Sequence, residues 1–206
     1  MEIYQDIEIN KTIENSLKRS INYSEYRKLV EELVVQKSTT GNDKTEDLAE
    51  YTKLNARRMK RWDKTLKISK ESQELVAQNQ KEMTWLVLTE SWCGDAAHVI
   101  PVINKVADLN DNIDLRLIMR DEHEDLMNAY LTNGSKSIPK LIAIDKKTGN
   151  VISTFGPRPS EATKLVEEYK LEHGSLTPEF KQDLQVWYNK DKGQTTISDL
   201  EKLLKD

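Results

Sequence analysis

In the first 80 residues of the chain, apolar residues recur at the spacing of helices. A short amphipathic stretch runs from Asn10 to Ile21, and a second stretch begins at Tyr23. The apolar residues of the second stretch are Tyr26, Leu29, Val30, Leu33 and Val34. Because they recur every three or four residues, the pattern predicts helices with one buried face. The polar run at residues 38–43 then interrupts the pattern and predicts a loop.

A longer helix is predicted from about Thr45 to Leu66. Five of its apolar residues are placed to form a buried stripe: Leu48, Tyr51, Leu54, Met59 and Trp62. The same helix carries a basic run at residues 57–61, Arg-Arg-Met-Lys-Arg. Charge runs on helices are usually solvated faces, so we expect this run to face solvent. An anion site or a partner-binding patch is the alternative interpretation.

From Thr84 onward, short apolar runs alternate with helical stretches. Strands are predicted at residues 84–89, 113–119, 140–144 and 151–155. Helices are predicted at residues 93–109, 121–131 and 160–173. The last two strands are separated only by a turn signal and form a hairpin. This order requires a mixed sheet with parallel and antiparallel pairs and with helices on both faces.

The end of the chain returns to helical character. Thr177 and Pro178 are typical of an N-cap followed by proline at the first helical position, and a last short helix is predicted to begin at Ser198. We therefore divide the chain into a helical N-terminal extension at residues 1–71, an α/β domain at 72–173 and a helical C-terminal extension at 174–206.

Composition narrows the classes of protein to which the chain can belong. The 206 residues are 37 % hydrophobic and 32 % charged, with a net charge of −4. That charge gives no electrostatic reason to expect nucleic acid as a partner, and no membrane partner is expected. No apolar run approaches the roughly 18 residues of a membrane span. The amino terminus has no export signal and the chain has one cysteine, so we expect a reducing cytoplasm. The oligomeric state is left open.

The single cysteine, Cys93, lies between a predicted strand and a predicted helix. A helix amino terminus has unpaired N–H groups and a partial positive charge, and both stabilise a thiolate. A reactive thiol is therefore one interpretation. The other is a small buried apolar side chain, which is the more common role of a lone cysteine.

Three spaced features narrow this choice: Trp92-Cys93-Gly94 at the helix start, Ser137-Ile138-Pro139 before a strand, and Gly156 after the next strand. Together they resemble the thioredoxin superfamily over residues 72–173. The outer helices and the sequence Trp-Cys-Gly-Asp are similar to a bacterial thioredoxin-like subset. The resemblance implies a thioredoxin-like mixed sheet with helices on both faces, extended by helices at both ends.

The resemblance also assigns roles to individual residues. It implies that Cys93 is the catalytic thiol, that the Ile138–Pro139 bond is cis, and that the backbone of Ile138 pairs with an extended substrate. Pro139 would hold that turn, because a cis peptide is costly except before proline. The remaining expected substrate-binding residues are Trp92, Gly94, Asp95 and Gly156. Neither a cofactor nor a metal is expected, because the scattered histidines form no zinc pattern with one cysteine.

The sequence departs from the family at three positions. Thioredoxins have a second cysteine where this chain has Ala96, and a buried acid where it has Val87. Nothing in this chain can therefore release a substrate that Cys93 has captured. Asp95 replaces the usual proline. Its carboxylate suits the helix dipole, but as a like charge beside the thiolate it raises the cysteine pKa. We therefore predict a Cys93 pKa only modestly below the free value of about 8.5.

Three further side chains could assist the thiol. His98 lies about 140° around the helix from Cys93, so we expect it to face solvent or another helix rather than pair with the thiol. Arg120 follows the second strand of the domain and could approach Cys93, or could pair with Asp121 or Glu124. Arg158 lies in the loop after the last strand, where it could touch a substrate.

Three hypotheses for function remain. The first is a monothiol thiol–disulfide oxidoreductase, acting on protein or small-molecule thiols and disulfides, in which an external thiol resolves the mixed disulfide. The second is a redox-inert thioredoxin-fold binding module, and the third is a thiol-based redox sensor. A buried Cys93 sulfur would favour the binding module.

Overall fold

The computed structural model describes residues 2–205, and their side chains from residue 8 onward. Its centre is a four-stranded sheet of β1 (Met83–Thr89), β2 (Ile113–Met119), β3 (Lys140–Asp145) and β4 (Val151–Phe155), in the order β2-β1-β3-β4. β1 is parallel to β2 and antiparallel to β3, and β3 is antiparallel to β4. The predicted mixed sheet is confirmed.

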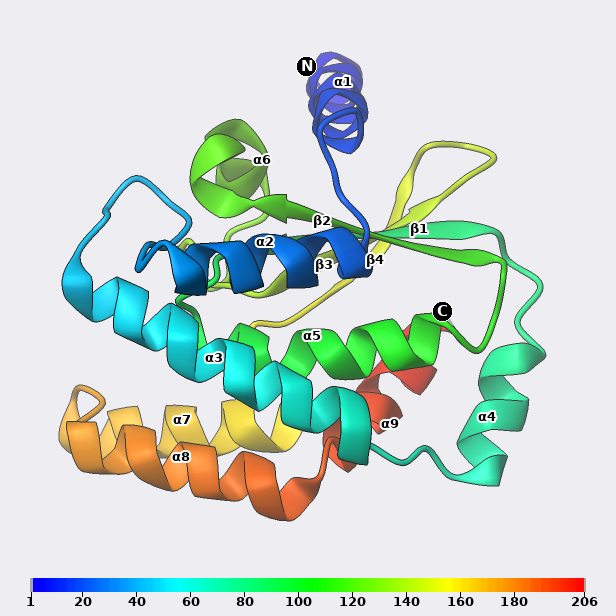
Figure 1. Cartoon of the computed structure of the whole chain (residues 1–206). Helices are drawn as coiled ribbons and strands as arrows, with labels where there is room; N and C mark the ends of the chain where they lie inside the picture. The colour runs from blue at the N-terminus through cyan, green and yellow to red at the C-terminus, as the bar shows by residue number, and fades with distance from the viewer. Residues whose placement is uncertain (1, 206) are drawn as a thin grey trace.

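Both faces of the sheet are covered by helices (Figure 1). Every residue of β1 is buried, which explains why this strand is a continuous apolar run rather than an alternating one. Helix α5 (Gly94–Ala107) follows β1 and is buried from Ala96 to Ile103. Helices of both extensions pack against it. The start of α5, where Cys93 lies, is therefore an interior position.

Four helices precede the sheet: α1 (Glu2–Leu17), α2 (Tyr23–Val35), α3 (Glu46–Thr65) and α4 (Lys70–Ala77). A capping box between Asn22 and Glu25 begins α2. The first helix ends four residues before the predicted boundary at Ile21. The backbone of Ile21 instead exchanges hydrogen bonds of 3.0 and 2.8 Å with Leu117, at the edge of β2.

The predicted buried stripe of α3 is wrong in its middle. Tyr51 and Leu54 are 51 % and 40 % exposed, whereas Thr52 and Asn55 are fully buried. The side chains of Thr52 and Asn55 bond to Ser91, just before the cysteine, and this rotates the helix away from the orientation that apolar content alone favours. Met59 and Trp62 are buried, as predicted.

The segment after β2 is also more broken than predicted. In place of one helix at 121–131, it forms a 3-10 turn, η1 (Arg120–Glu122), and a short helix, α6 (Glu124–Ala129). His123 separates them with φ −131° and ψ 49°, outside the helical region.

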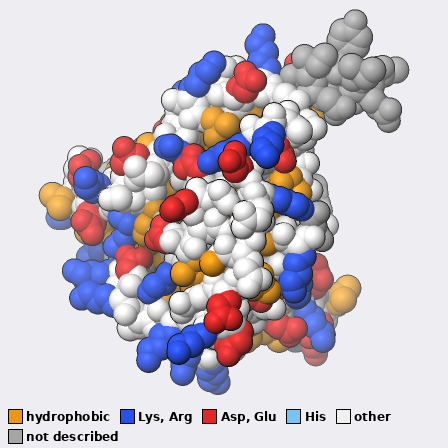
Figure 2. Space-filling model, turned by 90° about the vertical axis from the view of Figure 1, so that its right-hand side faces the viewer, with side chains coloured by type: hydrophobic (Ala, Val, Ile, Leu, Met, Phe, Trp, Pro, Cys, Tyr) orange, Lys and Arg blue, Asp and Glu red, His pale blue; other side chains and the backbone are white. Residues whose placement is uncertain are grey.

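The C-terminal helices are α7 (Ser160–His173), α8 (Pro178–Asp191) and α9 (Gln194–Leu203). Thr177 caps α8 as predicted, but α9 begins four residues before the predicted Ser198. None of the helices within residues 2–205 is long and apolar enough to span a membrane. On the face shown in Figure 2, charged side chains of both signs are interspersed and apolar side chains occupy only small areas.

Candidate functional site

Cys93 is the N-cap residue of α5, and the turn that precedes it closes with a 3.1 Å hydrogen bond from the Cys93 N–H to the Glu90 carbonyl. The residue is only 8 % exposed. Its thiol donates a hydrogen bond of 3.3 Å to the carbonyl oxygen of Ile138, and the Ile138–Pro139 bond is cis. The structure thus brings together three residues that the resemblance assigned to one site.

Gly156 packs against Pro139 of this site. Its φ is +106°, and a Cβ on it would lie 2.2 Å from the carbonyl oxygen of Pro139. Only glycine fits a backbone approach this close at such a φ value. The contact is with the proline turn and not with Cys93, so the position of Gly156 is explained by packing. A direct contact of Gly156 with substrate remains a prediction.

A buried cluster of hydroxyl groups fixes the turn before Cys93. The Ser91 hydroxyl lies 2.8 Å from the Thr52 hydroxyl and 3.1 Å from that of Thr39, and it accepts the backbone N–H of Thr40 at 3.0 Å. Asn55 donates its side-chain amide to the Ser91 carbonyl at 2.9 Å. This cluster joins α3 and the loop before it to the cysteine turn.

Sequence analysis missed this cluster, although it contained a usable signal. Thr52 and Asn55 lie at helical spacing from the apolar Met59, so they could have been proposed to share its buried face of α3. The partner Ser91 directly precedes Trp92-Cys93. Only the fold shows that these two segments meet.

The Cys93 pKa is raised to about 12, first by burial and then by the negative charge of Asp95. The backbone N–H groups of Ala96 and Asp95 and the charge of Arg158 act in the opposite direction but do not outweigh burial. The predicted modest lowering of this pKa is therefore wrong. The sequence indicates that Cys93 lies at a helix amino terminus, but it does not show that folding removes water from the thiol.

Asp95 is held by partners inside the molecule. Its carboxylate lies 2.7 Å from an Arg158 guanidinium nitrogen and accepts the Tyr188 hydroxyl at 2.9 Å. Burial raises the Asp95 pKa, and the Arg158 charge and the Tyr188 hydrogen bond oppose that increase. Asp95, which was expected to bind substrate, and Arg158, which could have touched it, thus neutralise each other, and Tyr188 of α8 contacts the pair.

Gly94 is covered in the same way. The position that a Cβ would take on Gly94 lies 3.5 Å from an Arg58 guanidinium nitrogen on α3 and 3.9 Å from the Gln185 amide nitrogen on α8. Arg58 in turn donates to the side chain of Asn55 at 3.0 Å. Both extensions therefore reach the residue next to the thiol.

His98 packs between helices, as predicted, and does not pair with the thiol. Trp62 donates its indole N–H to His98 Nδ1 at 2.9 Å, so His98 Nε2 carries the ring proton and donates to Gln185 at 2.7 Å. The Tyr188 ring stacks on the imidazole at 4.4 Å. Burial lowers the His98 pKa to about 3, which keeps the ring neutral.

Trp92 lies against Arg120, whose guanidinium carbon is 5.1 Å from the indole ring centre. Arg120 pairs with Asp121 at 2.7 Å, which is the alternative left open by the sequence. Beside them is Glu90, which sequence analysis missed. It is fully buried, accepts the Asp121 N–H at 2.9 Å, and has a pKa raised by burial.

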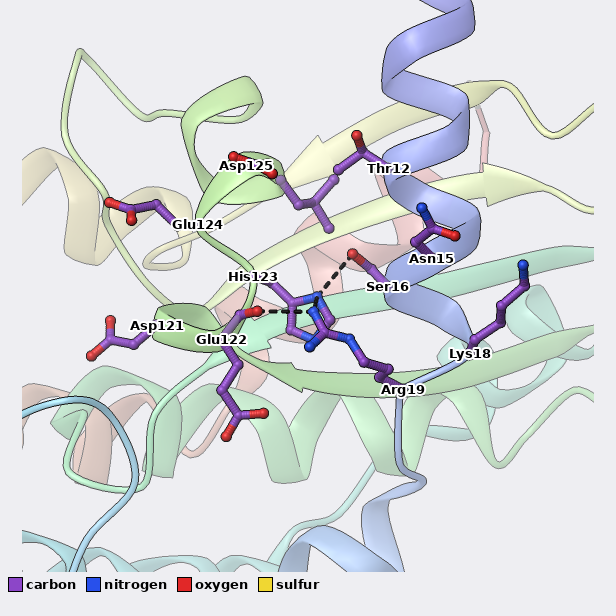
Figure 3. A pocket seen from close by; sticks show the side chains of 11 residues that line it. Thr12, Asn15, Ser16, Lys18, Arg19, Asp121, Glu122, His123, Glu124 and Asp125 are labelled. Carbon is purple, nitrogen blue, oxygen red and sulfur yellow. Dashed lines mark hydrogen bonds between the residues drawn. The ribbon is translucent and has the colours of Figure 1, made fainter.

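A separate cleft lies between α1 and the segment of η1 and α6 (Figure 3). It has a volume of about 620 Å³, and His123 lies in it within 2.9 Å of the Ser16 hydroxyl and 3.1 Å of an Arg19 nitrogen. Because a guanidinium can only donate, the Nδ1 atom of His123 is an acceptor. Burial and the Arg19 charge lower the His123 pKa to about 4, so this ring too is neutral.

The comparisons with known proteins agree with the fold. The thioredoxin family model matches residues 41–170, well over half of the chain. The chain belongs to the thioredoxin family. No curated protein matches it significantly. Among the described residues, no group of three or more His, Cys, Asp or Glu side chains is arranged to hold a metal ion.

Two solved structures resemble this thioredoxin-like protein. A protein of unknown function from Pseudomonas aeruginosa is 19 % identical over 76 % of this chain and 85 % of its own, with a TM-score of 0.56. An HIV epitope-scaffold protein is 18 % identical over 90 % of this chain and 98 % of its own, also with a TM-score of 0.56. At this identity they support the fold alone.

Proposed function

We propose that this thioredoxin-like protein is a binding protein without redox turnover, in which the Cys93 turn joins the helical extensions to the sheet. One observation carries the proposal: the Cys93 thiol is buried, protonated at neutral pH, and donates its hydrogen to the Ile138 carbonyl. The thiolate is the nucleophile in disulfide exchange, and a thiol with a pKa of about 12 supplies almost none of it at neutral pH. We expect the protein to act in a reducing cytoplasm.

The surroundings of the thiol support the same proposal. The Ile138 carbonyl, which the resemblance offers to a substrate backbone, is taken by the thiol, and both Ile138 and Pro139 are buried. Asp95 and Arg158 are paired with each other, and the Ser91 hydroxyl cluster bonds the turn to α3. Because the site is occupied by the chain's own groups, the ligand surface is expected on the helical extensions.

Thiol accessibility in the full-length protein tests the proposal. Alkylation of Cys93 by iodoacetamide at pH 8 should be at least about a hundredfold slower in the native protein than in urea, because the pKa of the folded thiol lies far above that pH. A dithiol-driven disulfide reduction assay should give equal rates for the wild type and Cys93→Ser. A native alkylation rate close to that of the unfolded chain would overturn the proposal.

A second candidate is monothiol exchange, and a specific observation favours it. The N–H groups of Asp95 and Ala96 and the charge of Arg158 all favour the thiolate, so uncovering Cys93 would remove the main obstacle. The thiolate would then attack a disulfide, forming a mixed disulfide and releasing one thiolate of the substrate. An external thiol would release Cys93 by a second exchange. A reduction rate that is lost in Cys93→Ser would support this candidate instead.

A further inference from the structure

Part of the basic run of α3 faces a cleft that the proposed role of Cys93 does not use. The cleft lies between the C-terminal end of α3 and the turn from α8 to α9, with a volume of about 370 Å³. Its polar lining residues are Arg61, Thr65, Lys67, Asn189, Lys192 and Gln194. Arg61 belongs to the basic run for which the sequence left an anion site open.

The charge of this cleft has one sign. Of the described residues that line it, every charged one is a cation: Arg61, Lys67 and Lys192. The cleft between α1 and α6 and a further one on the exposed side of α3 both contain carboxylates among their lining residues. Since the whole chain carries a net charge of −4, an all-cationic cleft runs against the average charge of the molecule.

The donors in the cleft are held in place by neighbours. The Arg61 guanidinium donates to the Asn189 side chain and lies 5.2 Å from the centre of the Trp62 ring. The Gln194 side-chain amide donates to the carbonyls of Lys67 and Lys192, each at 3.2 Å. One side chain therefore ties together the two segments that carry the lysines.

The turn that carries Lys192 is packed firmly against the core. Gly193 has a φ of +77°, and a Cβ on it would lie 2.9 Å from Leu66 and 3.0 Å from Val102 on α5. The absence of a side chain lets the backbone approach both residues. The start of α9 is thereby held at a fixed distance from the end of α3.

We propose that this cleft binds a phosphate dianion, either inorganic phosphate or the phosphate group of a small monoester. Arg61 offers a planar pair of donors suited to two phosphate oxygens, and Lys67 and Lys192 add positive charge from the two sides of the cleft. The proposal names a ligand class for the binding role proposed above and in that sense rests on it. Thiol accessibility and phosphate binding are nevertheless separate measurements.

Calorimetric titration of the full chain tests this site, using inorganic phosphate in one arm and glycerol 2-phosphate in the other. We expect saturable binding with a Kd below about 1 mM. The double variant Lys67→Gln/Lys192→Gln should weaken binding at least about tenfold, because two charge-assisted contacts are lost. Both lysines are exposed, so the variant should fold, and circular dichroism would verify this.

The matched control is Lys53→Gln, which removes the same charge from the exposed side of α3, where Lys53 pairs with Glu50. It should leave the Kd unchanged, as should Cys93→Ser. If both phosphate probes fail to saturate, if the double variant binds like the wild type, or if Lys53→Gln weakens binding equally, the proposal is wrong. Binding of a DNA oligonucleotide without binding of either phosphate probe would also overturn it.

Discussion

Two neighbouring regions beside α3 and α8, a closed end next to Cys93 and a cationic end next to Arg61, differ in how their charges are paired. At the Cys93 end, Asp95 is neutralised by Arg158 and capped by Tyr188. At the other end, Arg61, Lys67 and Lys192 line a cleft to which the described residues contribute no carboxylate. The same pair of helices thus closes one site and leaves the other open to an anion. On the phosphate proposal above, charge pairing, and not the fold alone, decides which end takes a ligand.

The largest effect should come from Gly156→Ala, at the closed end. The added Cβ would meet the Pro139 carbonyl at 2.2 Å with φ at +106°, so we expect the free energy of unfolding to fall by about 3 kcal/mol or more. Urea denaturation measures it. Gly149→Ala is the control, because Gly149 also has a positive φ, +74°, but its Cβ would meet nothing within 4 Å. Gly149→Ala should lower the free energy of unfolding by about 1 kcal/mol. If the two variants lose the same free energy, the contact of Gly156 with Pro139 is not tight.

Ser91→Ala should have the next largest effect. It removes the hydroxyl that bonds Thr39, Thr52 and the buried Thr40 N–H, and we expect this to lower the free energy of unfolding by about 2 kcal/mol. The same variant should speed alkylation of Cys93, because the cover supplied by α3 is loosened. If stability falls but the alkylation rate does not change, the hydroxyl cluster does not contribute to the burial of the Cys93 thiol.

Lowering the pH should reduce the free energy of unfolding through the two buried histidines, His98 and His123. His98 and His123 titrate near pH 3 and 4 when folded, whereas an unfolded histidine titrates near 6.5. The unfolded chain therefore takes up protons first as the pH falls, and stability that is complete above pH 6.5 declines below it. We expect a loss of about 1.5 kcal/mol per histidine between pH 6.5 and 5.

The pH dependence can be assigned to each histidine by substitution. Urea denaturation of His98→Gln and His123→Gln at both pH values should show a smaller loss than in the wild type. His98 contacts Gln185 and Tyr188 of α8, so its protonation acts on the closed end next to Cys93. A wild-type slope in His98→Gln would mean that this ring is not kept neutral by the fold.

Tyr188→Phe is the mildest of these changes. It removes the hydroxyl that donates to Asp95 and should lower the free energy of unfolding by about 1 kcal/mol. The control is Tyr51→Phe, because Tyr51 is 51 % exposed on α3. Identical stabilities for the two variants would show that Asp95 is held by Arg158 without help from α8.

Much of the architecture could be predicted because it depends on local patterns. The strand at Ile113–Met119 and the helix at Ser160–His173 have the predicted boundaries. The errors arise where distant groups override local preference. Ile21 leaves its helix to bond with β2, and Tyr51 turns outward because Thr52 and Asn55 face Ser91. No local pattern contains those partners.

For the cysteine, the sequence by itself determined three things. It placed the thiol at a helix start, excluded an internal disulfide, and removed the resolving cysteine by placing Ala96 in that position. Only the tertiary structure decided the protonation state, because a pKa depends on burial and on charges brought close by folding. The helical extensions remove water from Cys93, and the loss of hydration outweighs the helix amino terminus that favours the thiolate.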